Sequence, residues 1–414
     1  MKKTTLRALA GASVLVVGYV AEGEAQTADE LSRGASVLDR PRPELDPLGV
    51  RAGSFLVFPR VEAGVSYETN VFAEPEDEDD DFLFVVNPSV AVRSDFSRHA
   101  LAFEAGAEFG RYADLTSENF FDYEVAGSGR LDVGVGGAAT ARLAHIRNHE
   151  DRGDPDQPTA AVEPVEYSST LGEVGYSQRF NRVTAGVSTS AEWLDYDDVG
   201  SAAGPVIDQD DRDRWVYSTN VRVGYLIQPR FEAYVRGTYN VVEYDQEQVD
   251  RDSQGYEIAI GSDFDLTGLI TGTAYVGYLS RDFDNEALDD PSGMSFGLDL
   301  DWAATQLTTV RATASRSLEE PTGFGSRERT RLGVGADHEL LRNLILSADA
   351  VYRIDEFNDT DREDDYYSLG VGALYTLNRN YYARAGYVFE TRNSNVNARD
   401  YDNNVVTLRL GARL

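Results

Sequence analysis

Several residue types that would point to a function are scarce or missing in this 414-residue sequence. It has no cysteine, so it forms no disulfide and carries no lipid on a cysteine, and this absence suits an exported protein. Its mean hydropathy of −0.39 excludes a bundle of membrane helices. Its 71 acidic residues against 38 basic ones give a formal net charge of −33. Such a charge argues against nucleic acid as a partner, because that binding depends on neutralising phosphates.

Catalytic and metal-binding signals are also absent. None of the four histidines has a recognisable serine partner. His145 and His149 share one face of a predicted strand but lie about 13 Å apart, which is too far to hold one metal ion. The acidic segment Asp154-Pro155-Asp156 lacks the glycine-containing spacing of a calcium loop. We therefore expect no catalytic residue, no metal site and no cofactor, and we expect a protein that is not an enzyme.

The N-terminus has the pattern of a secretory signal peptide. Lys2 and Lys3 precede an apolar run over 8–20, and small residues follow it. A charged start, a short apolar core and a small-residue exit predict a signal peptide over 1–25, cleaved near Ala25. A buried helix is the alternative explanation of the same run.

From residue 58 onward, apolar and polar residues alternate with a period of two. The clearest stretch is 215–227, in which the odd positions are mostly aromatic or aliphatic and the even ones are mostly polar. This period predicts β-strands. We expect about 18 strands, or 16 if one hairpin is lost. The expected strands are 58–72, 82–93, 100–112, 121–133, 138–149, 166–180, 183–196, 215–227, 231–244, 256–264, 269–281, 294–303, 307–318, 327–339, 344–357, 366–377, 381–392 and 403–414.

The connections between these strands are of two alternating kinds. One kind is short and contains Arg or Asn, as in 228–230 and 341–343. The other is longer and acidic, as in 76–81 and 195–213. Short turns at one end and long loops at the other are typical of an outer-membrane β-barrel, with periplasmic turns and extracellular loops. We therefore expect acidic extracellular loops, although any single acidic run is also explained as a solvated loop.

The last predicted strand, 403–414, has an apolar face that includes Leu410 and a polar face that includes Arg409. An open sheet edge invites aggregation, and lipid leaves no backbone group unpaired. We therefore expect this strand to pair with the first one, 58–72. The sequence predicts an all-β fold, a transmembrane antiparallel up-and-down β-barrel over 58–414. A soluble β-sandwich with aromatic residues in its core is the alternative.

Residues 26–57 do not fit the strand pattern. Pro41, Pro43 and Pro47 favour extended backbone and prevent regular pairing. We expect a short irregular N-terminal arm that either lies on the periplasmic side or is tucked into the lumen.

A barrel of about 16 to 18 strands encloses a lumen too wide for side chains to fill. Charged residues on the inward positions are therefore candidates for lining a pore. They either form a path for a solute or only solvate the inner wall. These pore-lining candidates are Glu104, Glu108, Arg142, Arg222, Glu232, Arg236, Asp299, Asp301, Arg329, Arg331, Asp349, Arg353, Arg384 and Arg409.

The stretch 40–101 resembles the family of outer-membrane beta-barrel porins associated with exopolysaccharide synthesis and export. The resemblance implies a pore of about 18 strands that carries polysaccharide from the periplasm to the cell surface, and it supplies no catalytic residue. The matching pieces are Arg40-Pro41-Arg42-Pro43, Asp46-Pro47-Leu48-Gly49, Gly53, Phe55-Leu56, Phe58-Pro59, Tyr67, Asn70-Val71-Phe72, Ser94-Asp95 and Arg98-His99-Ala100-Leu101.

We therefore expect an outer-membrane protein whose partners are membrane lipid, a polysaccharide and, through residues 40–49, a periplasmic export protein. The acidic outer mouth would repel an anionic polymer unless divalent cations bridge the two, so it suits a neutral or amino-sugar polymer better. A general cation-preferring porin for small solutes is the alternative, and a structural or adhesive surface barrel is the third.

Overall fold

The computed structural model describes residues 36–158, 160–202, 204–246, 251–319, 326–358, 360–396 and 399–414. The predicted signal peptide, 1–25, lies outside the described residues, as do the first ten residues of the predicted arm. Among the described residues, no helix is long and apolar enough to cross a membrane.

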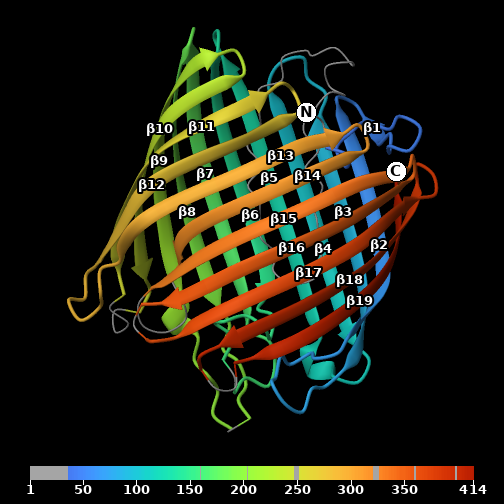
Figure 1. The fold of residues 1–414 in the computed structure, drawn as a ribbon, viewed down its shortest axis with the longest axis vertical. Coiled ribbons are helices and arrows are strands. Elements are labelled where there is room, and N and C mark those ends of the chain that lie inside the picture. Colours follow the sequence, from blue (N-terminus) through green and yellow to red (C-terminus); the bar gives the residue numbers. More distant parts are fainter. Residues whose placement is uncertain are drawn as a thin grey trace.

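One antiparallel sheet of nineteen strands makes up nearly the whole fold. Strands β2 to β19 each pair with their neighbours in the chain, and β19 also pairs with β2, from Val405–Glu68 to Arg413–Arg60. The sheet therefore closes into an 18-strand barrel with one extra strand, β1, which pairs only with the start of β2. Closure removes the open edges, as the last predicted strand requires. Figure 1 shows the tilted strands wrapping around the lumen.

The strands are β1 (Val50–Ala52), β2 (Phe55–Glu68), β3 (Asp81–Ser94), β4 (Ala100–Tyr112), β5 (Phe120–Val133), β6 (Gly137–His149), β7 (Glu166–Phe180), β8 (Val183–Tyr196), β9 (Arg214–Gln228), β10 (Phe231–Tyr244), β11 (Ser253–Leu266), β12 (Ile270–Phe283), β13 (Ser292–Thr305), β14 (Thr308–Glu319), β15 (Arg327–Leu341), β16 (Leu344–Phe357), β17 (Glu363–Thr376), β18 (Tyr381–Ser394) and β19 (Tyr401–Arg413). Two single-turn 3-10 helices lie in loops, η1 (Thr116–Glu118) and η2 (Asp210–Arg212).

The predicted barrel is confirmed, and the differences are at strand ends. The expected strand 58–72 begins at Phe55 and ends at Glu68, because the buried Asn70 amide donates to the carbonyl oxygens of Glu74 and Asp402 at 2.7 and 3.0 Å. These bonds replace strand pairing beyond Glu68. Strand β11 is longer than its expected range of 256–264.

Strand β1 was not expected. It pairs with β2 through a tight turn at Gly53, whose positive φ of 62° suits glycine. Three residues are too few to show a period of two in the sequence.

Each strand has one apolar outer face and one polar inner face. In β19, Val406, Leu408 and Leu410 are 52, 53 and 64% exposed, while Thr407 and Arg409 lie on the other face. The same alternation recurs around the ring, so the outside of the barrel is a continuous apolar surface. Such a surface matches the hydrocarbon of a bilayer, and the inner face matches water.

The two ends of the barrel differ, as expected. Short turns such as 181–182, 229–230 and 342–343 join strands at one end, and β1 and the C-terminus lie at that end too. Long connections such as 150–165 and 197–213 join strands at the other end, which is at the bottom of Figure 1. We refer to these as the short-turn end and the long-loop end.

Candidate functional site

The fourteen pore-lining candidates all lie on the faces opposite the exposed apolar residues. On β9, for example, Val221 and Val223 are exposed outward, and Arg222 between them is on the inner face. On β15, Leu332 and Val334 are exposed outward, which places Arg331 inside. The structure therefore places both positive and negative side chains on the wall of one lumen.

Several candidates pair across neighbouring strands. Arg222 contacts Glu232 on β10 at 3.1 Å and Asp263 on β11 at 2.5 Å. Arg236 contacts Glu257 at 2.7 Å. These side chains are partly buried. The pairs Arg222–Glu232 and Arg236–Glu257 join strands that are already hydrogen-bonded, whereas Arg222 reaches Asp263 across the intervening strand β10. Such pairs fix the inner wall and leave little free charge there.

A second group of charges surrounds Glu62, which is buried on β2. The phenol of Tyr382 donates to Glu62 at 2.7 Å, and Arg60 contacts it at 2.7 Å. Arg384 and Arg409 lie farther from it, at 3.8 and 3.7 Å. One carboxylate is therefore shared by three guanidinium groups at the seam where β19 closes on β2.

Other candidates are not paired. Within the described part of the chain, Arg142, Arg331, Glu104 and Asp299 form no ion pair, whereas Arg329 and Arg353 share Asp355 at 2.6 and 3.0 Å. Arg331 faces Arg353 directly across β15 and β16. Like charges at directly opposed positions destabilise a sheet. The presence of two arginines at these positions therefore does not contribute to the stability of the barrel.

Arginine dominates one side of the lumen. We call the inner face of β15, β16, β18 and β19 the basic wall, after its inward-facing arginines. Strands β4, β5, β7 and β8 lie on the far side of the ring and carry inward carboxylates such as Glu104, Glu124 and Glu173. The arginines of the basic wall are Arg327, Arg329, Arg331, Arg353, Arg384, Arg392, Arg409 and Arg413.

Tyrosine rings accompany the lumenal arginines. The guanidinium carbons of Arg222, Arg236 and Arg353 lie 3.7, 4.3 and 4.4 Å from the ring centroids of Tyr234, Tyr275 and Tyr366. Cation–π contacts of this kind hold the charged group against a flat apolar face. The lumen wall thus repeats three chemistries: a flat ring, a guanidinium and a carboxylate.

One loop, which was not expected inside the barrel, crosses the lumen at the long-loop end. We call it the mouth loop; it joins β6 to β7 over residues 150–165, of which all but Thr159 are described. In the strand order, β7 and β16 are half the ring apart. The mouth loop nevertheless reaches β15, β18 and the loops that precede β17 and β19, so its tip crosses the opening.

The tip is held mainly by arginines that donate to backbone carbonyl oxygens. Arg392 donates to Gly153 at 2.9 Å, and Arg362 and Arg399 both donate to Pro155, at 3.2 and 3.1 Å. A side-chain ion pair also joins Asp156 of the tip to Arg327 of β15, at 3.3 Å.

The near side of the mouth loop is held by charge pairs and a small apolar cluster. Arg152 forms a bidentate contact with the buried Glu118 of η1, at 2.7 Å through each of two nitrogens. At the base, Val165 is fully buried and packs with Tyr196 and Val199 from β8 and the following loop. The base is thus a packed structure, whereas the tip rests on hydrogen bonds.

Glu150, at the start of the mouth loop, pairs with Arg212 of η2, and both side chains are buried. Burial raises the pKa of Glu150 to about 7, against the opposing effect of the Arg212 guanidinium. Burial also raises the pKa of Asp156, and the Arg327 guanidinium opposes that shift. The charge of Glu150, which helps to fix this loop, therefore depends on conditions near neutral pH.

The N-terminal arm lies at the other end of the lumen. From here on, the word arm means residues 36–49. The Val37 amide donates to Thr309 at 2.9 Å, and Arg42 contacts Glu339 at 3.0 Å; both partners are buried inner-face residues. Arg413 donates to the carbonyl oxygen of Leu45 at 3.0 Å. Of the two expected locations, the described part of the arm therefore lies against the lumen wall at the short-turn end.

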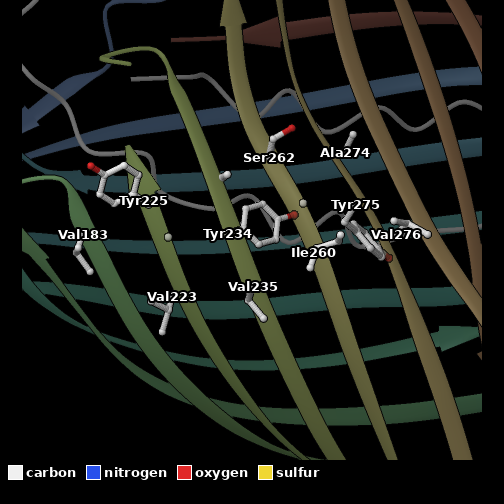
Figure 2. Close-up of a pocket in the computed structure, with 13 residues that line it drawn as sticks. Val183, Val223, Tyr225, Tyr234, Val235, Ile260, Ser262, Ala274, Tyr275 and Val276 are labelled. Atoms are coloured by element: carbon white, nitrogen blue, oxygen red, sulfur yellow. The ribbon is translucent and has the colours of Figure 1, made fainter. Parts of the chain in front are cut away.

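Two further features were tested as sites. Asp198, Asp208 and Asp210 bring carboxylate oxygens within 4.8 Å of one another, but all three are exposed and such groups are common without an ion. A hollow of about 850 Å³ is lined by valine, isoleucine, alanine and tyrosine of β8–β12, and most of these residues, such as Val235 and Ile260, face outward (Figure 2). It belongs to the membrane-facing surface and not to the lumen.

The residues that the sequence analysis missed are those that place the mouth loop and the arm. The pore-lining candidates did not include Arg327, Arg362, Arg392 and Arg399. These arginines lie near strand ends or in loops, where the alternation of apolar and polar residues does not show which way a side chain points. A usable signal was the number of arginines that flank the acidic loops of the last three hairpins.

Comparisons with known proteins agree with this architecture. The family described as "Putative beta-barrel porin 2" matches residues 42–414. No curated protein matches the sequence. Similar solved structures include Acinetobacter baumannii OccAB4, with 10% identity, a TM-score of 0.47 and 86% of this chain and 98% of that chain covered. Pseudomonas aeruginosa OpdO has 11% identity, a TM-score of 0.47 and coverages of 87% and 97%. Likeness at this level says nothing about the solute.

Proposed function

The chain belongs to the beta-barrel porin family that matches it over 42–414, and from this membership and the lumen wall we propose that its pore passes exopolysaccharide from the periplasm to the cell surface. Membership in a porin family makes it an outer-membrane channel and not an enzyme. In such barrels the short turns are periplasmic and the long loops extracellular. The arm then lies at the periplasmic entrance and the mouth loop at the extracellular exit.

The observation that carries this proposal is the repeated lining of rings, guanidinium groups and carboxylates along the lumen. Sugar hydroxyls accept hydrogen bonds from arginine and donate them to carboxylates, and sugar rings stack on tyrosine. Each single contact is weak in water, so a polymer can bind one set while leaving the next. Arg236 with Tyr275 and Glu257 is one such set, and Arg353 with Tyr366 and Asp355 is another.

The arm is proposed to serve the entrance. Its backbone is fixed to the wall by Arg379 and Arg413, which donate to Pro43 and Leu45 at 2.8 and 3.0 Å. Leu48 remains 67% exposed. We propose that residues 40–49 dock a periplasmic export partner there. The signal peptide, 1–25, would bring the chain to this compartment.

We expect deletion of the gene to leave polymer synthesis intact, while surface polymer falls and periplasmic polymer accumulates. Deletion of residues 36–49 alone should give the same defect with the barrel still folded, since the arm adds no strand to the ring. Immunodetection of polymer on intact cells and in periplasmic extracts measures both. Normal surface polymer in the null strain, with slower uptake of small solutes, would reject export.

A cation-preferring porin for small solutes is the second candidate, and the mouth loop favours it because the loop narrows the opening. The exposed acidic residues of 76–80, with Asp208 and Asp210, also concentrate cations at the outer mouth. We expect planar-bilayer recordings in a low-salt KCl gradient to show cation preference, which declines as salt screens the loops. Removing residues 76–81 should lower the preference modestly, because other acidic loops remain. Anion selectivity at low salt would contradict this candidate.

A further inference from the structure

The arginines that hold the tip of the mouth loop donate to backbone carbonyl oxygens, which are weaker acceptors than the carboxylates that arginine can bind. Arg392 and Arg399 each spend a guanidinium N–H group on a carbonyl oxygen, of Gly153 and of Pro155 respectively. A carbonyl oxygen is neutral, whereas arginine forms stronger, often bidentate hydrogen bonds with carboxylates. A carboxylate that reaches these arginines would therefore compete with the loop.

The basic wall beside these contacts contains an arginine without a carboxylate partner within the described ranges. Arg331 faces Arg353 across β15 and β16, and among the described residues Arg331 forms no ion pair. Arg353 pairs with Asp355, and Arg329 pairs with the same carboxylate. Arg329 also pairs with Glu319 at 2.8 Å, but Arg331 has no such partner in the described part of the chain and faces a guanidinium that shares its own, so one more negative charge would stabilise the opposed pair. This second observation does not depend on the loop.

From these two observations we propose that Arg331, Arg353, Arg392 and Arg399 form a binding site for carboxylate-bearing sugars, and that a bound carboxylate releases the tip of the mouth loop. The inference rests on the proposed function and names the substrate class: an acidic polysaccharide, such as one built from uronic acids. The docked loop then blocks the mouth to polymer, but not to ions, and it leaves the mouth when polymer arrives.

Such a site also offsets the repulsion between the acidic loops and an anionic polymer. The polymer meets arginines first, at the arm and along the basic wall, and meets the acidic loops only at the exit. Fixed charges set no direction of transport, so the arginines only stabilise the polymer inside the pore and offset the repulsion that it meets at the exit.

The test uses the full-length protein in planar bilayers at low salt with two defined probes, trigalacturonate and neutral maltotriose, added on the periplasmic side. We expect trigalacturonate to cause brief blocking events and maltotriose to cause far fewer. Arg331→Gln should shorten the blocking events about ten-fold, as loss of one charge-assisted partner implies. Arg331 has no ion pair to lose, so this variant should fold. Arg51→Gln, on the exposed strand β1, is the matched control and should not change blocking.

Loop release is read separately through a single engineered thiol. Pro155 is buried at the tip and the chain has no cysteine, so Pro155→Cys places one reporter under the docked loop. Trigalacturonate should speed its reaction with a maleimide several-fold, and maltotriose should not. Equal responses to the two sugars would overturn the inference while leaving export standing. Normal surface polymer in the null strain, with selective block by trigalacturonate retained, would instead reject export and leave the carboxylate site in place.

Discussion

Shortening the mouth loop should raise the single-channel conductance of the pore about two-fold or more, because an 18-strand barrel encloses a wide aqueous lumen that this loop crosses. The change is replacement of residues 151–164 by a short Gly-Ser linker. Glu150 and Val165 are kept, since the Glu150 amide donates to the Val165 carbonyl oxygen at 2.8 Å and closes the base. Planar-bilayer recordings in 1 M KCl measure the conductance with surface charge screened.

A second long loop provides the control. The connection between β12 and β13, residues 284–291, forms hydrogen bonds with its own strand ends and with Asp252, and among the described residues it makes no contact across the lumen. Replacing residues 285–289 by a similar linker should leave conductance unchanged. If the mouth-loop variant conducts like the parent protein, the loop does not set the narrowest part of the pore, and the constriction lies deeper along the wall.

The barrel itself could be predicted from the sequence because its cause is local. A strand buried between lipid and water must alternate, so the period of two gives both the strand and the face of every residue on it. For this reason the sequence alone predicts that Arg222, Arg353 and Arg409 lie on the inner face. The ends of strands were less certain, since pairing there is replaced by side-chain bonds such as those of Asn70.

The mouth loop could not be predicted because its contacts are neither local nor periodic. Gly153 and Arg392 are 239 positions apart, and the bond is to a backbone oxygen that every residue carries. The acidic composition of 150–166 was explained equally well as a solvated loop. The arm shows the same limit: its prolines excluded regular strands, but only the contacts of Val37 and Arg42 place it against the lumen wall.

Locking the tip of the mouth loop to the opposite wall should reduce surface polymer to the level of a null strain. The pair Asp156 and Arg327 marks the point where tip and wall meet, at 3.3 Å between side-chain atoms. The double variant Asp156→Cys, Arg327→Cys leaves two thiols separated by the length of the lost side chains. A short cleavable thiol crosslinker can span that gap, and no native cysteine competes for it.

The expected result follows from size. Ions and water pass around a docked loop, so conductance in bilayers should persist after crosslinking, whereas a polymer needs the whole opening. Surface polymer should fall when the crosslinker is added to intact cells and return when it is cleaved, and neither single-cysteine variant should respond. Export that continues with the loop fully crosslinked would show that polymer does not pass this mouth, because a covalent bridge across the lumen leaves it no path.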